Sequence, residues 1–206
     1  MILAVLANDT QKDEITACPF FQKHEVLFSE NISLWSNHIA DVFIDFCFEP
    51  VPERIKILAR LLPKPVLVNA VADTVDRLHP DFIRINGWPG FLKGHLLEAA
   101  AAENVREMAV ALFGGDLVFV KDVPGLVSPR IVSMIINEAF FTWEAGTSTR
   151  EEIDLAMKAG VGYPYGPFEW TEKIGLEKIA ELLLRLKEEN PLYEMAEGLK
   201  LKAVNP

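Results

Sequence analysis

Residues that would support disulfides, metal sites or polyanion binding are scarce in this 206-residue chain. Cysteine occurs twice, as Cys18 and Cys47. Both lie in apolar surroundings without metal-type spacing, which favours buried thiols in a reducing compartment. The four histidines form no HxH or HExxH pattern, so we expect no metal site. With 20 Lys and Arg against 30 Asp and Glu, the net charge of −10 argues against a nucleic-acid partner.

Long apolar runs are also missing. No stretch approaches the roughly 20 residues that span a bilayer, and the first seven residues lack the basic flank and the length of a signal peptide. Internal repeats and low-complexity segments are absent as well. Hydrophobic residues nevertheless make up 50% of the chain, which is enough for a packed core. The sequence therefore predicts a soluble, cytoplasmic protein that does not cross a membrane.

Residues 1–122 alternate short apolar runs with helix-like segments, a pattern that favours a mainly parallel sheet. A helix is predicted from Pro52 to Leu62, because its apolar residues fall at helical spacing. Between residues 95 and 115 the alanines favour one long helix that stops at Gly114-Gly115. The predicted strands are residues 2–6, 25–28, 41–48, 66–71, 82–85 and 117–120.

The character of the chain changes at residues 122–125, after which every segment looks helical. Residues 128–145 are apolar on almost every side, as in a helix buried in a core or a subunit interface. Ser148-Thr149-Arg150-Glu151 fits a capping box for a second helix, which ends at Gly160. The remaining helices are predicted from Pro167 to Gly175 and over residues 176–186. We therefore divide the chain into an α/β domain at 1–122 and an all-α domain at 123–206.

The second half of the chain resembles the C-terminal domain of the 3-hydroxyacyl-CoA dehydrogenases. The resemblance lies in DVPGLVSPRIVSMIINEAFF (122–141), in TREEIDLAMKAGVGYPYGPFEW (149–170) and in Ile174-Gly175-Leu176. It implies an α/β fold, with a shortened Rossmann-like, mainly parallel sheet domain followed by an all-α C-terminal domain. It also implies NAD as the cofactor, no metal, a homodimer formed through the C-terminal helices, and a family that oxidises 3-hydroxyacyl thioesters.

The first half resembles the family's nucleotide-binding domain more weakly, in ADVFIDFCFEPVPERIKILARL (40–61) and PVLVNAVADT (65–74). By resemblance, the cofactor-binding residues are Asp45, Glu49, Arg54 and Asn69. The glycine-rich turn of the family is missing, because NDTQKD occupies residues 8–13. A Cβ at each of these positions blocks close approach of a pyrophosphate, and two carboxylates add negative charge beside it.

The resemblance also assigns the catalytic positions, and several of them have changed. The family's base is a His held by a Glu; here Asn86 and Glu98 take those places, and an amide cannot act as a general base. His95 lies close by in sequence as a candidate displaced base. The family's Ser falls on an apolar stretch after Asn69. Its Asn falls on Ser128, which could either bind a substrate carbonyl or cap the helix before Pro129.

Three hypotheses about function remain open from the sequence. The first is a member of the family with degenerate catalytic and NAD sites that keeps the fold and binds an acyl-CoA-like ligand. The second is an active NAD-dependent oxidoreductase with rebuilt groups: His95 or Asp45 as base, Glu98 as its partner and Ser128 on the substrate. The third is a non-catalytic dimerisation or interaction module.

Overall fold

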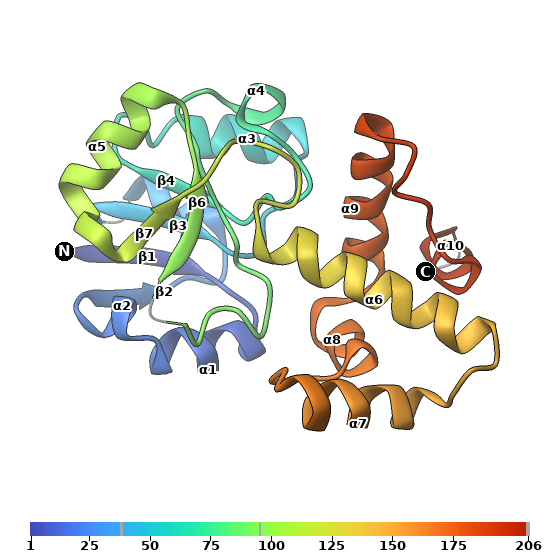
Figure 1. Cartoon of the computed structure of the whole chain (residues 1–206). Helices are drawn as coiled ribbons and strands as arrows, with labels where there is room; N and C mark the ends of the chain where they lie inside the picture. The colour runs from blue at the N-terminus through green and yellow to red at the C-terminus, as the bar shows by residue number, and fades with distance from the viewer. Residues whose placement is uncertain (38, 95, 205–206) are drawn as a thin grey trace. The chain divides into compact units, whose positions relative to one another are not determined.

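The computed structural model describes residues 1–37, 39–94 and 96–204, and the chain divides into two compact units, Met1–Leu126 and Val127–Pro206 (Figure 1). The first unit contains a sheet flanked by helices. Its described strands are β1 (Ile2–Leu6), β2 (Glu25–Phe28), β3 (Val42–Asp45), β4 (Val66–Val68), β5 (Ile83–Ile85), β6 (Leu97–Ala100) and β7 (Leu117–Phe119). The six predicted strands are all present, and four of them are shorter than predicted.

The sheet of the first unit has the strand order β2-β1-β3-β4-β5-β6-β7. Neighbouring strands are parallel except for β5 and β6, which run antiparallel. The usual dinucleotide-binding order, 3-2-1-4-5-6, places two strands outside the first one. Here β2 alone lies outside β1, so the predicted shortened, mainly parallel, Rossmann-like fold is confirmed.

Helices cover both faces of this sheet, as expected of a doubly wound fold. One face packs against α1 (Asp9–Ala17), α2 (Pro19–Gln22) and α5 (Glu103–Phe113), which contribute Ile15, Phe21 and Phe113 to its core. The other face packs against η1 (Ile32–Asn37), α3 (Pro52–Ala59) and α4 (Val75–Leu78). A 3-10 turn, η2 (Gly114–Asp116), follows α5.

The long helix predicted over residues 95–115 is wrong. Residues Leu97–Ala100 form β6, and α5 begins only at Glu103. The helix-favouring alanines yield to tertiary pairing, because β6 bonds to β5 on one side and to β7 on the other. Leu97, Ala99 and Ala100 are buried in that position. The predicted stop is confirmed, since Gly114 caps α5 with a φ of 63°.

The second unit is helical throughout its regular elements, which confirms the predicted all-α character. Its described helices are α6 (Ser128–Glu144), α7 (Arg150–Val161), α8 (Pro167–Ile174), α9 (Leu176–Glu189) and α10 (Glu197–Val204). The capping box of α7 joins Thr149 to Glu152, one residue later than predicted. Its end lies at Val161 rather than Gly160, because Gly162 adopts the left-handed conformation that closes the helix.

Candidate functional site

In open α/β sheets, ligands bind beside the carboxyl ends of the parallel strands. At this edge of the first unit, Asn8 follows β1, Phe46 follows β3, Asn69 follows β4 and Asn86 follows β5. The same edge would hold a dinucleotide in the Rossmann fold that the sequence predicted. Its polar contacts therefore decide which ligands the unit can accept.

The turn between β1 and α1 is closed by the chain itself. Asn8 is the N-cap of α1, and its side chain accepts a hydrogen bond from the Gln11 backbone at 2.9 Å. In return, the Gln11 side-chain oxygen accepts a hydrogen bond from the Asn8 backbone N–H at 3.1 Å. This reciprocal capping box occupies backbone N–H groups that a glycine-rich turn would present to a phosphate.

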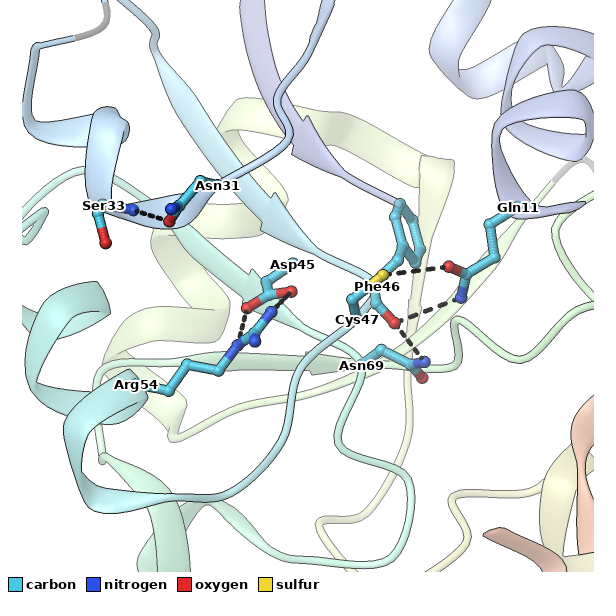
Figure 2. A network of polar contacts seen from close by, with 8 residues as sticks. All are labelled: Gln11, Asn31, Ser33, Asp45, Phe46, Cys47, Arg54 and Asn69. Atoms are coloured by element: carbon cyan, nitrogen blue, oxygen red, sulfur yellow. Dashed lines mark hydrogen bonds and ion pairs between the residues drawn. The ribbon is translucent and has the colours of Figure 1, made fainter. Parts of the chain in front are cut away.

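Gln11 is fully buried and reaches across the edge of the sheet (Figure 2). Its amide nitrogen donates to the Phe46 carbonyl at 3.3 Å and to the Gly87 carbonyl at 2.9 Å. Its amide oxygen also lies 3.8 Å from the Cys47 sulfur. One side chain from α1 therefore binds the loops that follow β3 and β5.

Asn69 completes this network from the end of β4. Its amide donates to the Phe46 carbonyl at 3.0 Å and accepts a hydrogen bond from the Gly87 backbone at 2.9 Å. The packing around Gly87 is tight, because an added Cβ would lie 2.4 Å from the Phe46 ring. We define the crevice network as Gln11, Phe46, Asn69 and Gly87. The groups of this network fill the region between the ends of β1, β3, β4 and β5.

Glu14, one turn further along α1, provides a second anchor. The residue is buried, and both of its carboxylate oxygens accept hydrogen bonds from the Gly90 backbone, at 2.9 and 2.8 Å. A carboxylate that receives a backbone N–H is well satisfied when it leaves water. Helix α1 is thus attached at two points to the loop that follows β5.

The predicted cofactor residues Asp45 and Arg54 bind each other. Arg54 donates two hydrogen bonds to the fully buried Asp45 carboxylate, at 2.7 and 2.8 Å (Figure 2). Burial raises the pKa of the Asp45 carboxyl, and the contact with Arg54 opposes that rise. Glu49 lies exposed in the loop between them. Asp45 therefore anchors α3 to β3.

The predicted catalytic residue Asn86, which follows β5, lies beside the predicted catalytic residue Glu98 of the antiparallel strand β6. The Asn86 backbone N–H donates to the Glu98 carbonyl at 3.0 Å. The Asn86 side chain is buried and accepts a hydrogen bond from the Trp88 backbone at 3.3 Å. His95, the candidate displaced base, lies outside the described residues. The pair thus keeps an adjacent arrangement, with an amide where a base would be needed.

Ser128 belongs to the second unit, where it is the first residue of α6. Val127, one residue earlier, stands at the N-cap position and makes no side-chain cap bond, so the two roles predicted for Ser128 both stay predictions. The hydroxyl remains a candidate for a substrate contact.

The family-like motifs of the second unit hold its helices together. Asp154 accepts hydrogen bonds from the first turn of α8, from the Phe168 backbone at 2.8 Å and the Glu169 backbone at 3.1 Å. Asn137 binds the Glu194 carbonyl at 2.7 Å and the Ala196 backbone N–H at 2.9 Å. These side chains are buried polar groups with satisfied bonds, so they support packing.

The residues at the β1–α1 turn do not fit the pyrophosphate of a dinucleotide in the usual manner. Residues 8–13 contain no glycine, so no position allows the close backbone approach that such a turn provides. Gln11 and Glu14 occupy the adjoining crevice, and Asp9 adds a carboxylate to the first helical turn. Among the described residues, no group of three His, Cys, Asp or Glu could hold a metal ion.

The fold and the ordered helical motifs define a class: a Rossmann-like unit followed by a helical dehydrogenase-type unit. A family model for the 3-hydroxyacyl-CoA dehydrogenase C-terminal domain matches residues 125–201. The second unit therefore matches the C-terminal domain of this family, which confirms the resemblance that the sequence suggested for this part of the chain.

Two curated relatives resemble part of the chain. The 3-hydroxyadipyl-CoA dehydrogenase of Escherichia coli (strain K12) is 40% identical over 74 residues, which are 36% of this chain and 16% of that protein. The mitochondrial hydroxyacyl-coenzyme A dehydrogenase of Homo sapiens is 39% identical over 89 residues, which are 41% of this chain and 28% of that protein. The matched regions thus span less than a third of these relatives.

Solved structures extend the likeness of the fold to nearly the whole chain. The (S)-3-hydroxybutyryl-CoA dehydrogenase PaaH1 from Ralstonia eutropha aligns with a TM-score of 0.69 and 18% identity, over 97% of this chain and 92% of that one. M. tuberculosis FadB2 aligns with a TM-score of 0.70 and 16% identity, over 98% and 92%. At these identities the likeness concerns the fold alone.

Sequence reasoning missed Gln11 and Glu14. The signal for Gln11 was present, because Asn8 followed three residues later by Gln11 is a capping-box pattern. Nothing local indicated that the same side chain would bind carbonyls 35 and 76 residues away. The two cysteines also differ from each other, since Cys18 is buried as predicted and Cys47 is only partly buried.

Proposed function

We propose that this chain is a member of the 3-hydroxyacyl-CoA dehydrogenase family with degenerate catalytic and NAD sites. The observation that carries the proposal is the buried Gln11 amide, bonded to the Phe46 and Gly87 carbonyls where a cofactor would lie. To admit a dinucleotide in the usual pose, α1 would have to give up these bonds. The loss of the Gln11 donor from the Gly87 carbonyl, and of one of two side-chain donors from the Phe46 carbonyl, would make that costly.

The arrangement of histidines supports the same proposal. A base for 3-hydroxyacyl oxidation is needed beside Asn86, at the carboxyl end of β5. The histidines within the described residues, His24 and His79, precede β2 and β5 and so lie toward the opposite edge of the sheet. The Asn86 amide cannot take the hydroxyl proton at neutral pH. An active enzyme with a histidine base would therefore need it from His95 or from outside this chain, and Asp45, the other candidate base, is bound to Arg54.

We propose that the chain retains two other family features, binding of an acyl-CoA-like ligand and a homodimer formed through the C-terminal helices. The helical motifs that match the family are intact, which supports a preserved scaffold. The apolar residues Val127, Ile131 and Phe141 are exposed at helical spacing along α6. A cytoplasmic location and the absence of nucleic-acid partners stay predictions from the sequence.

Turnover and ligand binding test this proposal separately. Purified chain is incubated with NAD and 3-hydroxybutyryl-CoA while NADH absorbance is followed, and acetoacetyl-CoA is titrated in parallel with tryptophan fluorescence as the readout. We expect no NADH formation and saturable binding of acetoacetyl-CoA. Steady NADH formation that Glu98→Ala abolishes would favour the active enzyme instead. Absence of both turnover and binding would leave the interaction module.

A further inference from the structure

Strand β2 forms one edge of the sheet in the first unit. Within the described residues it pairs with β1 only, in the parallel register Ile2 with Glu25 through Val5 with Phe28 (Figure 1). The usual dinucleotide-binding order continues beyond this point with another strand. Here the edge is left with an unpaired row of backbone groups, which is a template for a further strand.

The hydrogen bonds to β1 show which backbone groups of β2 face outward. Glu25 donates to the Met1 carbonyl at 3.0 Å, and Ser29 donates to the Val5 carbonyl at 2.8 Å. Alternate residues of a strand turn their N–H and C=O groups to opposite sides. The outward groups are therefore those of Val26 and Phe28.

The side chains at this edge are apolar and partly exposed. Leu27 is 36% and Phe28 is 42% exposed. Val26 and Phe28 share the sheet face covered by α1 and α2, where they line a shallow groove of about 220 Å³ together with Ile15 and Phe21. Exposed apolar side chains beside open backbone groups favour pairing with another strand.

We propose that the β2 edge pairs antiparallel with β2 of a second copy of this chain, about a two-fold axis at Leu27. This register sets Val26 opposite Phe28 of the partner subunit, and each such pair exchanges both of its N–H···O=C bonds. The opposed β-branched and aromatic side chains form a favourable cross-strand pair on the groove side. Leu27 faces the partner's Leu27 on the other side.

The charges along the edge fit this register. Glu25 lies opposite the partner's Ser29, and Glu30 lies opposite the partner's His24. No carboxylate of this segment therefore faces another carboxylate, an arrangement that would destabilise the pair. The segment is thus complementary to itself, which is the property that a two-fold interface requires.

The pairing involves one short strand on each side, so its area is small beside the roughly 1,600 Å² of a standard interface. We therefore expect reversible association that grows with protein concentration. It is independent of the homodimer proposed for the helical unit, because the two surfaces share no residue.

Disulfide trapping tests the register. Across a non-hydrogen-bonded antiparallel pair the Cα atoms lie about 4.5 Å apart, within the range that a disulfide bridges. In a Cys47→Ala background, Leu27→Cys should form a covalent dimer when oxidised glutathione takes up the two electrons of the thiol pair. Val118→Cys is the matched control, since Val118 is 39% exposed on the opposite edge strand β7.

Adding Val26→Pro to the Leu27→Cys protein removes an outward N–H but leaves the bonds to β1 in place. We expect the covalent dimer to form at least about tenfold more weakly, because two hydrogen bonds per interface are lost. Dimer yield from Leu27→Cys no higher than from Val118→Cys would overturn the proposal. That result would also follow if the edge instead served an unrelated extended peptide.

Sedimentation equilibrium provides a second test that does not depend on trapping. A lysine at an edge position is a device that opposes strand pairing. At high concentration Phe28→Lys should lower the mass of the assembly, to that of a monomer if the helical unit does not dimerise and to that of a dimer if it does. An unchanged mass, with circular dichroism showing a folded protein, would contradict the β2 pairing.

Discussion

At the scale of single residues, Gln11 shows how much of the site the sequence could predict. Its role as a helix cap is encoded locally, by Asn8 three residues earlier. Its bonds to Phe46 and Gly87 depend on where the sheet brings those carbonyls, which no local pattern specifies. The same holds for Asp45 and Asn69. The resemblance identified these two residues, but only the folded structure shows which groups they bind.

Replacing Gln11 tests the crevice network energetically. Gln11→Ala removes a cap and leaves the buried Phe46 and Gly87 carbonyls with fewer donors, so we expect a loss of about 1–3 kcal/mol in the free energy of unfolding. Urea unfolding measures it. Gln22→Ala removes an exposed hydrogen bond from a side-chain amide to the Thr16 carbonyl, and it should change the free energy of unfolding by no more than about 0.5 kcal/mol. Equal losses in the two variants would contradict the role given to Gln11.

Arg84 is the second residue with a decisive structural role. Its fully buried guanidinium donates to the Ala70 carbonyl at 2.8 Å and the Val71 carbonyl at 3.1 Å, and forms an ion pair with Asp122. Arg84→Met should therefore cost about 3–5 kcal/mol, because it removes the cation paired with Asp122 and one donor from each of two carbonyls. Lys23→Met, which breaks an exposed pair, should cost at most about 1 kcal/mol in the same unfolding assay.

The cap of α7 predicts a pH dependence. Hydrogen bonds from Ser148 and from Thr149 lower the pKa of Glu152 below its ordinary 4.5. A lowered pKa stabilises the fold above the unfolded-state value, and this contribution is lost as the pH falls through the folded value. Urea unfolding at several pH values below about 5 should show a smaller loss of stability for Glu152→Gln than for the native chain. A loss of stability equal to that of the native chain would contradict the role given to Glu152.

At the scale of elements, the spacing of apolar residues and the positions of capping residues, prolines and glycines predicted most of the fold. The strands followed their apolar runs, and the later helices began and ended near their caps, prolines and glycines. The failure at residues 95–115 has a physical cause: alanine has a high intrinsic helix propensity, but β6 gains two hydrogen-bonded neighbours. Propensity is a local quantity, and strand pairing is not.

Two glycines provide a test at this scale. Gly87→Ala places a methyl group 2.4 Å from the Phe46 ring and 2.8 Å from the Asn69 side chain. We expect a loss of about 1–3 kcal/mol from overpacking, measured by chemical unfolding. Gly160 lies within α7 and has no atom within 4 Å of an added Cβ. Gly160→Ala should therefore stabilise the chain by up to about 1 kcal/mol, and the opposite order would count against this account of the crevice.

At the scale of the whole molecule, the likeness to the family is strongest in the helical unit, and the chemical groups that we propose to be degenerate lie mainly in the first unit. The helical unit matches the family over residues 125–201. In the first unit, the glycine turn, the base and the serine are all changed. The resemblance could be recognised in the helical unit because the packing of its helices requires an ordered pattern of residues. The closed crevice could not be foreseen, because it arises from side chains that meet only in the folded sheet.

Isothermal titration of the full chain with NADH is the most direct measurement of the central claim, that the chain's own side chains occupy the cofactor crevice. We predict no saturable heat at concentrations up to about 1 mM, which corresponds to a binding free energy weaker than about 4 kcal/mol. Saturable binding at micromolar NADH, with one coenzyme per chain, would contradict the claim.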